Sequence, residues 1–368
     1  MREQDFRKYL RKNPGREIPE LAGFCHCAVI PAWKENQYLP EVLNSIECAQ
    51  KNESVAVLVV VNHPAGASPE DSLELLKILE QRNQAGIFAL YAPDLKGGVG
   101  EARKIGMDCF TRSRTFEQLD KSVIFSLDGD SPVEADYFQE SLAVLEKHPD
   151  APGIIIKIRH SRADTPEQEW AIREYERYMF RYARKLQESG SPYGFVSIGS
   201  GFGVRVRSYI QSGGMKIKKA GEDFYFLQEL AKQGELCQSR SILVHPSPRI
   251  SERVPFGTGR SVKELLGGGK MEDIPDFAFK KLKMLLEAAK KHDGFLFQTE
   301  LPEHIPGDDI NFLQAEKFYT VWPLIVKNTP PEYNARLQAF FRWFDGLKAL
   351  RFLHAYQRTE QKTIVDNV

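Results

Sequence analysis

The stretch Val123-Ile124-Phe125-Ser126-Leu127-Asp128-Gly129-Asp130 is the most informative part of this chain, because an apolar run ends in two carboxylates one residue apart. An apolar run of this kind is typical of a buried strand in a parallel sheet, and open α/β sheets bind ligands at the carboxyl ends of their strands. Two such aspartates can approach one divalent cation, which prefers oxygen ligands and often retains phosphates in its coordination shell. Asp-Gly-Asp is also a common sequence in turns, so the rest of the chain must decide whether these residues bind a metal ion.

Strands and helices alternate on both sides of this stretch. Apolar runs predict further strands at 24–30, 55–61, 87–91, 154–158 and 241–244, and apolar residues at helical spacing predict helices at 39–46, 73–79, 100–110 and 135–145. Alternation of this kind predicts an α/β fold with a doubly wound, mostly parallel sheet. We expect the first strand to stop at Pro31, because proline lacks a backbone donor, and the strand at 154–158 to lie near the sheet edge.

The C-terminal part of the chain has a different pattern. After the glycine run 267–269, helical spacing dominates at 277–292, 314–327 and 332–361. We therefore expect an α/β domain over 1–260, with its core at about 24–260, and a helical C-terminal region over 261–368. The last helix is apolar around most of its circumference, so it packs on the core, in a partner such as a second copy of the chain, or on a membrane surface. Burial is the favoured interpretation.

Composition excludes several classes of protein. Lys plus Arg equals Asp plus Glu at 50 each in 368 residues, so the overall charge does not favour a nucleic-acid surface. The longest apolar run, 55–61, is too short to span a bilayer, and the charged N-terminus lacks the apolar core of a secretory signal. These features predict a cytoplasmic protein, with peripheral contact at the inner membrane face left open. The five scattered cysteines predict neither a disulfide framework nor a zinc site.

Four segments, taken in order, resemble a family-2 glycosyltransferase. They are VIPAWKE at 29–35, GVGEARKIG at 98–106, the Asp-x-Asp (DxD) triplet at 128–130, and Gly213-Gly214 followed by Gly221-Glu222-Asp223. Together they span about residues 24 to 260, which makes the set far more specific than any single motif. The resemblance implies a GT-A fold, which is Rossmann-like, and transfer of one sugar from a UDP- or GDP-sugar to an acceptor hydroxyl. The acceptor is a glycan, a lipid-linked molecule or a small molecule, and the transfer is expected to invert the anomeric centre.

The resemblance also assigns roles to single residues. It implies that the nucleotide-sugar donor is bound by Pro31, Ala32, Glu35, Arg103, Asp128 and Asp130. Asp130, with Asp128 and His245, is expected to hold Mn²⁺ or Mg²⁺, which neutralises charge on the leaving diphosphate. Each role has a structural alternative: Pro31 as a strand terminator, Arg103 as a surface ion pair, and His245 as a structural histidine after a strand.

Glu222 and Asp223 match the acidic pair that precedes a helix in that family. The resemblance implies that Asp223 is the general base that takes the proton of the acceptor hydroxyl, with Glu222 as its neighbour. Acidic residues in the first turn of a helix are also common as caps, which is the structural alternative. Further along the chain, Arg249, Arg253 and Arg260 flank a glycine-containing loop. They form either a lid over the diphosphate or a solvated loop.

The chain also departs from the family pattern. Asn62-His63-Pro64 follows the second strand, where the family usually has an acidic pair that reads the nucleobase, so the base stays open. The Gln-x-x-Arg-Trp stretch of processive enzymes is missing, which favours a single transfer over polymer synthesis. Three alternatives remain: a retaining enzyme of the same fold, a nucleotidyltransferase, and a non-catalytic module that binds through its helical region.

Overall fold

The computed structural model of the protein describes residues 1–50, 53–82, 86–218, 221–250, 257–292 and 307–366. They divide into two compact units, one of residues 1–176 and 197–270, the other of 177–196 and 271–368. The division falls within α6 (Pro166–Glu188). The predicted domain boundary between residues 260 and 261 remains a prediction, because this division into compact units does not test it. None of the described helices is both long and apolar enough to cross a membrane.

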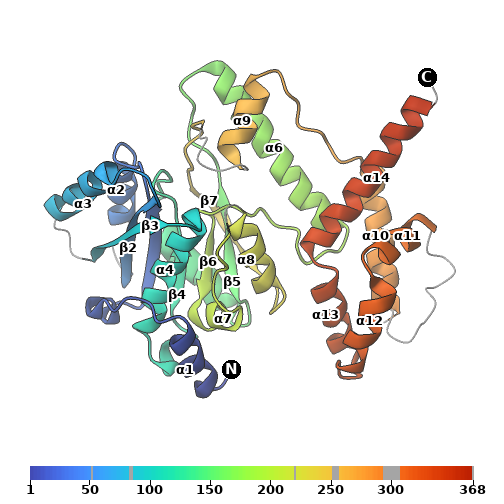
Figure 1. Ribbon diagram of the computed structural model, residues 1–368, viewed down its shortest axis with the longest axis horizontal. Coiled ribbons are helices and arrows are strands. Elements are labelled where there is room, and N and C mark those ends of the chain that lie inside the picture. The colour runs from blue at the N-terminus through green and yellow to red at the C-terminus, as the bar shows by residue number, and fades with distance from the viewer. Residues whose placement is uncertain (51–52, 83–85, 219–220, 251–256, 293–306, 367–368) are drawn as a thin grey trace. The chain divides into compact units, whose positions relative to one another are not determined.

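A seven-stranded sheet built from described residues forms the centre of the first unit, in the order β3-β2-β1-β4-β6-β5-β7 (Figure 1). Its strands are β1 (His26–Ala32), β2 (Val55–Pro64), β3 (Ile87–Leu95), β4 (Val123–Ser126), β5 (Gly153–Ile158), β6 (Phe202–Arg205) and β7 (Cys237–Val244). Strands β1 to β4 are parallel to one another, β5 is parallel to β7, and β6 runs antiparallel to β4 and β5. The predicted doubly wound, mostly parallel α/β sheet is confirmed.

Strand β6 is the part of the sheet that the sequence pattern does not predict. It has four residues, which is too short for a hydrophobic period to stand out from the loops around it. It pairs with both β4 and β5. The strand at 153–158 is second from the edge, with β7 outside it, which agrees with its predicted place near the edge.

Alternate residues of the central strands face two layers of helices. Ala28, Ile30 and Ala32 of β1 belong to the main hydrophobic core. That core is completed on the same face by α2 (Leu39–Ala49), α3 (Glu70–Arg82) and α5 (Tyr137–Lys147). On the other face lies α4 (Gly98–Arg112), where Gly106 lets the helix backbone come close to Val29 and Val60. The strands are buried on both sides, as a parallel sheet requires.

The first strand continues through Pro31, so the expectation that it stops there was wrong. Pro31 pairs with Val60, and Ala32 with Val61, on the β2 side. On the other side the pairing of β1 with β4 ends at Val29. Val29 faces β4, since its carbonyl accepts from Leu127, and Pro31 two residues later faces the same way. The missing proline donor therefore removes no ladder hydrogen bond.

The described residues of the first unit also form the start of α6 and the helices α1 (Glu3–Lys12), α7 (Val206–Gln211), α8 (Glu222–Ala231) and α9 (Thr258–Leu266). Short 3₁₀ turns lie at Pro19–Gly23 and Phe116–Gln118. Helix α1 is attached to α4 through a buried carboxylate, because the hydroxyls of Tyr9 and Tyr209 donate to Oδ1 of Asp108 at 2.6 and 2.8 Å. The N-terminal residues are thus part of the fold rather than a charged tail.

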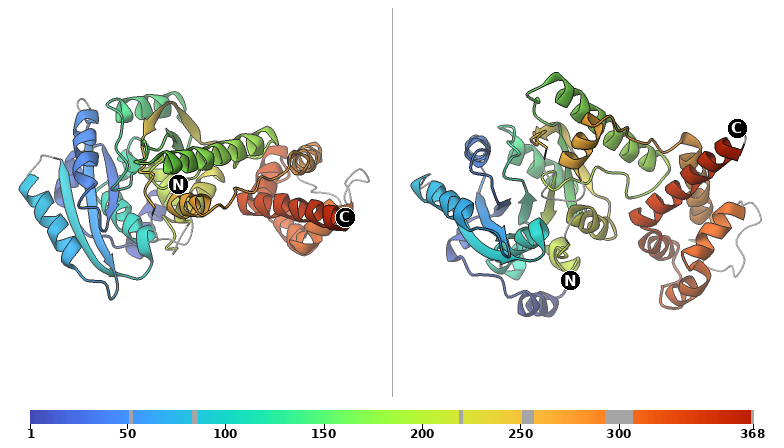
Figure 2. Two further views of the ribbon diagram at one scale, coloured as in Figure 1. Left: turned by 90° about the horizontal axis from the view of Figure 1, so that it is seen from above. Right: turned by 45° about the horizontal axis from the view of Figure 1, so that its top comes forward.

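The C-terminal part of the second unit, residues 271–368, is helical where the structure describes it and is coloured orange to red in Figure 2. Besides the end of α6, the unit contains α10 (Asp276–Lys291), α11 (Gly307–Ala315), α12 (Phe318–Lys327), α13 (Tyr333–Trp343) and α14 (Gly346–Asp366). Its core is aromatic and includes the buried side chains of Phe318, Trp322, Phe340, Trp343, Phe344 and Phe352. The expected single helix at 332–361 is in fact two helices, because the chain breaks at Phe344 and Asp345.

Candidate functional site

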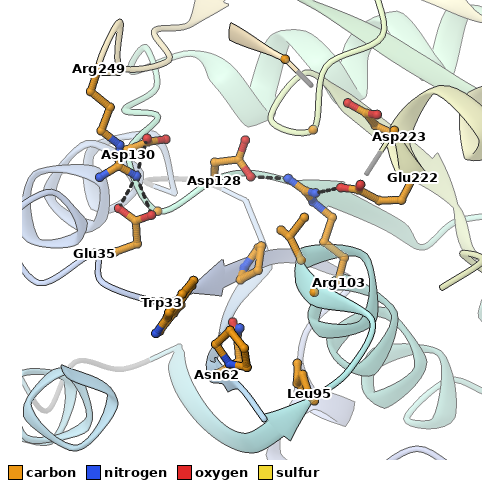
Figure 3. A pocket seen from close by; sticks show the side chains of 18 of the residues that line it. Trp33, Glu35, Asn62, Leu95, Arg103, Asp128, Asp130, Glu222, Asp223 and Arg249 are labelled. Atoms are coloured by element: carbon orange, nitrogen blue, oxygen red, sulfur yellow. Dashed lines mark hydrogen bonds and ion pairs between the residues drawn. The ribbon is translucent and has the colours of Figure 1, made fainter. Parts of the chain in front are cut away.

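A cavity of about 400 Å³ opens at the carboxyl ends of the parallel strands. It is lined by Trp33, Asn62, Leu95 and Asp128, which lie near or just beyond the carboxyl ends of β1 to β4. The first turns of two helices line it as well, α4 through Gly98 and Val99, and α8 through Glu222 and Asp223. This is the edge at which open α/β sheets bind ligands. Figure 3 shows the apolar end of the cavity, with Trp33 and Leu95, apart from the charged end.

Arg103 connects two of the predicted acidic segments. Its side chain is 3% exposed. Its guanidinium donates to Asp128 through Nη2 and to Glu222 through Nη1, and its Nε donates to Ser126 at 3.1 Å. Burial alone would lower the pKa of Arg103, but the negative charges of Asp128 and Glu222 outweigh it and raise that pKa. Arg103 therefore stays charged and holds β4 and α8 together, which is more than a surface ion pair.

A glycine makes room for this guanidinium. A Cβ at Gly199 would overlap the guanidinium of Arg103, and the carbonyl of Gly199 accepts a 2.7 Å hydrogen bond from the hydroxyl of Ser126. The loop before β6 is therefore shaped around Arg103. Neither Ser126 nor Gly199 is marked by a motif in the sequence, so only their position in the fold shows their part in the site.

Asp223 lies next to the ion pair of Arg103 and Glu222, but its carboxylate has a different hydrogen-bond donor. Its Oδ1 accepts a 2.7 Å hydrogen bond from its own neighbour, the backbone N–H of Phe224, as a first-turn carboxylate does. Burial is the main cause that raises the pKa of Asp223. The positive charge of Arg103 lowers that pKa, and the negative charge of Asp128 raises it further. The pKa of Glu222 is raised for the same main reason. A carboxylate with a raised pKa at the wall of a cavity is suited to accept a proton.

Asp130 lies at the opposite side of the charged end, together with Glu35. Nη2 of Arg249 lies 2.7 Å from Oδ2 of Asp130, and 2.6 and 2.7 Å from the two oxygens of Glu35. Gly129 allows this approach, since a Cβ there would lie 2.8 Å from Cγ of Glu35. The three charged side chains form one cluster in Figure 3. Arg249, which the sequence suggested only as part of a lid, is thus a central residue of the charged end.

The donor set at this edge fits a hard divalent cation in chemical type. Asp128 and Asp130 supply carboxylate oxygens, and such ions commonly take one or two carboxylates together with substrate phosphates. Among the described residues, no group of three or more His, Cys, Asp or Glu side chains is arranged to hold a metal ion. The protein would therefore contribute only part of a coordination shell. Within the described part of the chain, the charged side chains that line the cavity are five carboxyl and two guanidinium groups, a formal charge of −3 that favours a bound cation.

His245 follows β7 at the same edge of the sheet, but it has its own protein partners. Its Nδ1 lies 3.1 Å from the carbonyl of Arg159, and its Nε2 lies 2.7 Å from Oε1 of Glu134. Both ring nitrogens therefore have protein partners, and His245 is not among the described residues that line the cavity. This arrangement agrees with the structural interpretation of the histidine, and its metal role stays a prediction without geometric support.

The remaining predicted residues fall in different places. Pro31 lines the cavity, whereas Ala32 points into the main core on the other face of the sheet. Arg260 is on α9 and forms an exposed ion pair with Glu264 at 2.7 Å. It is not among the described lining residues. Arg253 lies outside the described residues. The structure therefore brings the donor and base residues together without Ala32 and Arg260.

Asn62 is a lining residue that the sequence marked only as a departure. It is 6% exposed, and its Oδ1 is buried with no hydrogen-bond partner. A buried amide oxygen without a donor is unusual in a folded protein, because it loses its hydrogen bond to water. Its place at the end of β2, between Trp33 and Leu95 in Figure 3, puts an unsatisfied polar atom at the apolar end of the cavity.

Comparison with known proteins gives a likeness at the level of solved structures. No protein-family model matches the chain, and no curated protein matches it. A crystal structure of Staphylococcus aureus TarS, residues 1–349, in complex with UDP-GlcNAc aligns at 14% identity and a TM-score of 0.47, covering 91% of this chain and 92% of that one. A second TarS structure, residues 1–349, aligns at 13% identity and a TM-score of 0.43, covering 91% of each chain. The residues of the cavity, rather than this likeness, support the function proposed below.

Proposed function

We propose that the protein is a glycosyltransferase that moves one sugar from a nucleotide-diphosphate sugar to an acceptor hydroxyl. The observation that supports this most directly is the meeting of three distant segments at one cavity. Asp128 and Asp130 follow β4, Glu222 and Asp223 begin α8, and Arg103 of α4 connects the two acidic pairs. These are segments whose motifs resemble the glycosyltransferase family, and a chance resemblance would not bring them to one site.

The same residues suggest how the transfer proceeds. The acceptor oxygen attacks the anomeric carbon of the donor while Asp223 takes the proton of that hydroxyl. The bond from the anomeric carbon to the diphosphate breaks, and the nucleoside diphosphate leaves with the bonding electrons. A direct displacement of this kind inverts the anomeric centre, so inversion is part of the proposal. Glu222 and Arg103 hold the start of α8 in place, which positions Asp223.

The leaving diphosphate needs positive charge around it. The first turns of α4 and α8 line the cavity, and helix N-termini favour anions because their amide N–H groups have no intrahelical partner. Bound Mn²⁺ or Mg²⁺ would neutralise part of the charge that develops on the phosphates. Asp128 and Asp130 are the residues that would hold such an ion.

Ligand-induced stabilisation is the direct test of this proposal. The melting temperature of the full chain would be measured against UDP-, GDP-, CMP- and dTDP-sugars, with and without Mn²⁺, because a ligand that binds the native state raises it. A Mn²⁺-dependent rise with one nucleotide, absent in Asp130→Ala, would support the donor site. If no donor shifts the melting temperature of a well-folded protein, the proposal is overturned.

The main competing function is a non-catalytic module of the same fold. It predicts that nucleotide sugars bind without turnover and that Asp223→Ala has no effect on any cellular role. The presence of Asp223 at the cavity, with its raised pKa, favours catalysis over that alternative. A nucleotidyltransferase is less well supported, because the glycine-and-arginine segment that such enzymes carry after the first strand is absent from this sequence.

A further inference from the structure

Arg249 forms an ion pair with Asp130, the carboxylate that is expected to hold the metal ion. Its Nη2 lies 2.7 Å from Oδ2 of Asp130 and within 2.7 Å of both carboxylate oxygens of Glu35. Its guanidinium carbon also lies 4.3 Å from the ring centroid of Tyr38. One side chain therefore neutralises two carboxylates and is supported by an aromatic face (Figure 3).

These contacts are substantially shielded from solvent. The side chains of Arg249, Asp130 and Glu35 are 18%, 17% and 7% exposed. Charge pairs with little solvent around them are screened less than surface pairs, and separating them is correspondingly more costly. Arg249 is thus a resident cation of the acidic edge rather than a surface arginine that happens to lie nearby.

A guanidinium in contact with Oδ2 of Asp130 weakens the binding of a divalent cation by the same carboxylate. The two positive groups repel each other, and the guanidinium already neutralises the charge that would attract the cation. The described residues that line the cavity carry a formal charge of −3, with both guanidinium groups included. Among these residues a diphosphate meets a net negative charge, so a bound cation would favour its entry.

We propose that Arg249 exchanges with a divalent cation at Asp130. In the donor-free protein Arg249 neutralises Asp130 and Glu35. When a nucleoside diphosphate and its cation bind, Arg249 releases Asp130 and donates to the diphosphate oxygens instead. This inference rests on the proposed function for the identity of the diphosphate ligand, but the competition at Asp130 is a property of the protein and the cation alone.

The exchange predicts a specific pattern of cation binding. Mn²⁺ alone should bind the wild-type chain weakly, because Arg249 competes for the charge of Asp130, and more tightly when UDP or GDP is present to receive the guanidinium. Arg249→Gln should bind Mn²⁺ at least tenfold more tightly than wild type without nucleotide. In that variant UDP or GDP should raise the Mn²⁺ affinity less than it does in wild type, since binding free energies are coupled reciprocally.

The experiment is a titration of the full chain with Mn²⁺, followed by the electron paramagnetic resonance signal of free Mn²⁺, with and without UDP or GDP. Wild type, Arg249→Gln and Arg249→Lys would be compared, with Arg249→Lys expected to resemble wild type because it retains the charge. Arg184→Gln is the matched control, since it removes an arginine whose exposed partner, Glu188, lies 3.7 Å away on the same helix. Melting temperatures would verify that each variant is folded.

Two results would separate this inference from the proposed function. A folded Arg249→Gln variant with unchanged Mn²⁺ affinity, or a gain equal to that of Arg184→Gln, would overturn the exchange even if nucleotide sugars bind. If Arg249→Gln does not fold, Arg249→Ala and Arg249→Met serve in its place under the same criterion. Conversely, a tenfold gain in Mn²⁺ affinity with no response to any nucleotide would retain the competition at Asp130 while overturning the glycosyltransferase proposal.

Discussion

At the scale of single residues, Glu222 and Asp223 are neighbours in the chain but have different surroundings. Glu222 is 5% exposed and its carboxylate is bound by Arg103. Asp223 lines the cavity, and its carboxylate accepts from the N–H of Phe224. Glu222 therefore holds the site together, whereas Asp223 is available to a substrate. Sequence spacing alone could not assign these two roles, because both residues are acidic and adjacent.

Exchanging each carboxyl for its amide tests this division of roles. In Asp223→Asn the rate constant for transfer should fall by about 10²–10⁴-fold, the usual contribution of a general base, with little change in stability. Glu222→Gln should instead destabilise the fold by about 2 kcal/mol, because a charged hydrogen-bond partner of the buried Arg103 is lost. Steady-state kinetics and chemical denaturation of both variants measure these effects. A Glu222→Gln protein as stable as wild type would contradict the structural role.

The raised pKa of Asp223 makes both activity and stability depend on pH. The base must be ionised, so activity should rise with pH through a value above the ordinary 3.8 of an aspartate. The free energy of unfolding should change in the opposite direction, because the native state binds the proton of Asp223 more tightly than the unfolded chain does. The contribution of Asp223 to stability is therefore complete below pH 3.8 and is lost as pH rises through its raised pKa. Rate and unfolding free energy against pH, for wild type and Asp223→Asn, test this. A transfer rate that already rises with pH at or below pH 3.8 would contradict this prediction.

At the scale of elements, the start of α14 shows how one side chain sets a helix boundary. The carboxylate of Asp345 accepts a 3.1 Å hydrogen bond from the backbone N–H of Lys348, three residues along, as an N-cap does. Gly346 then begins α14, so the apolar pattern of 332–361 is divided although its hydrophobic spacing is continuous. Periodicity detects the helices, whereas the cap decides where one ends and the next begins.

Replacing the cap tests its contribution. Asp345→Ala should lower the free energy of unfolding of the helical unit by about 1 kcal/mol, because the N–H of Lys348 loses its partner. Asp345→Asn should retain most of the stability, since the amide oxygen is also a good N-cap acceptor. Urea denaturation of the three proteins measures the difference. Equal losses in the alanine and asparagine variants would show that the negative charge, rather than the cap, stabilises this position.

At the scale of the whole molecule, the two compact units have separate cores. The first is centred on the aliphatic strands of the sheet, and the second on aromatic side chains of the C-terminal helices. Phe340 is fully buried in the second core, with ring centroids 5.9 and 6.2 Å from those of Trp322 and Trp343. The described residues that line the cavity belong to the first unit. Stability of one unit and ligand binding by the other should therefore be separable.

Phe340→Ala provides a test of that separation. It should lower the stability of the helical unit by about 3–5 kcal/mol, the usual cost of deleting a buried phenylalanine ring. The melting response of the first unit to its nucleotide sugar should be retained. Leu324→Ala, at a position 63% exposed, is the matched control and should change stability by less than about 0.5 kcal/mol. Loss of the ligand response in Phe340→Ala alone would contradict independent units.

Local patterns along the chain were enough to predict the strands of the parallel sheet, the helical C-terminal region, and the acidic triplet at the end of β4. Each depends on residues close together in sequence, whose hydrophobic spacing and turn chemistry reflect burial directly. The contacts that make the site are of another kind, since Arg103 meets Glu222 across 119 residues and Arg249 meets Glu35 across 214. No periodicity encodes such pairs. They form because folding brings the strand ends to one edge, where buried charges must find partners.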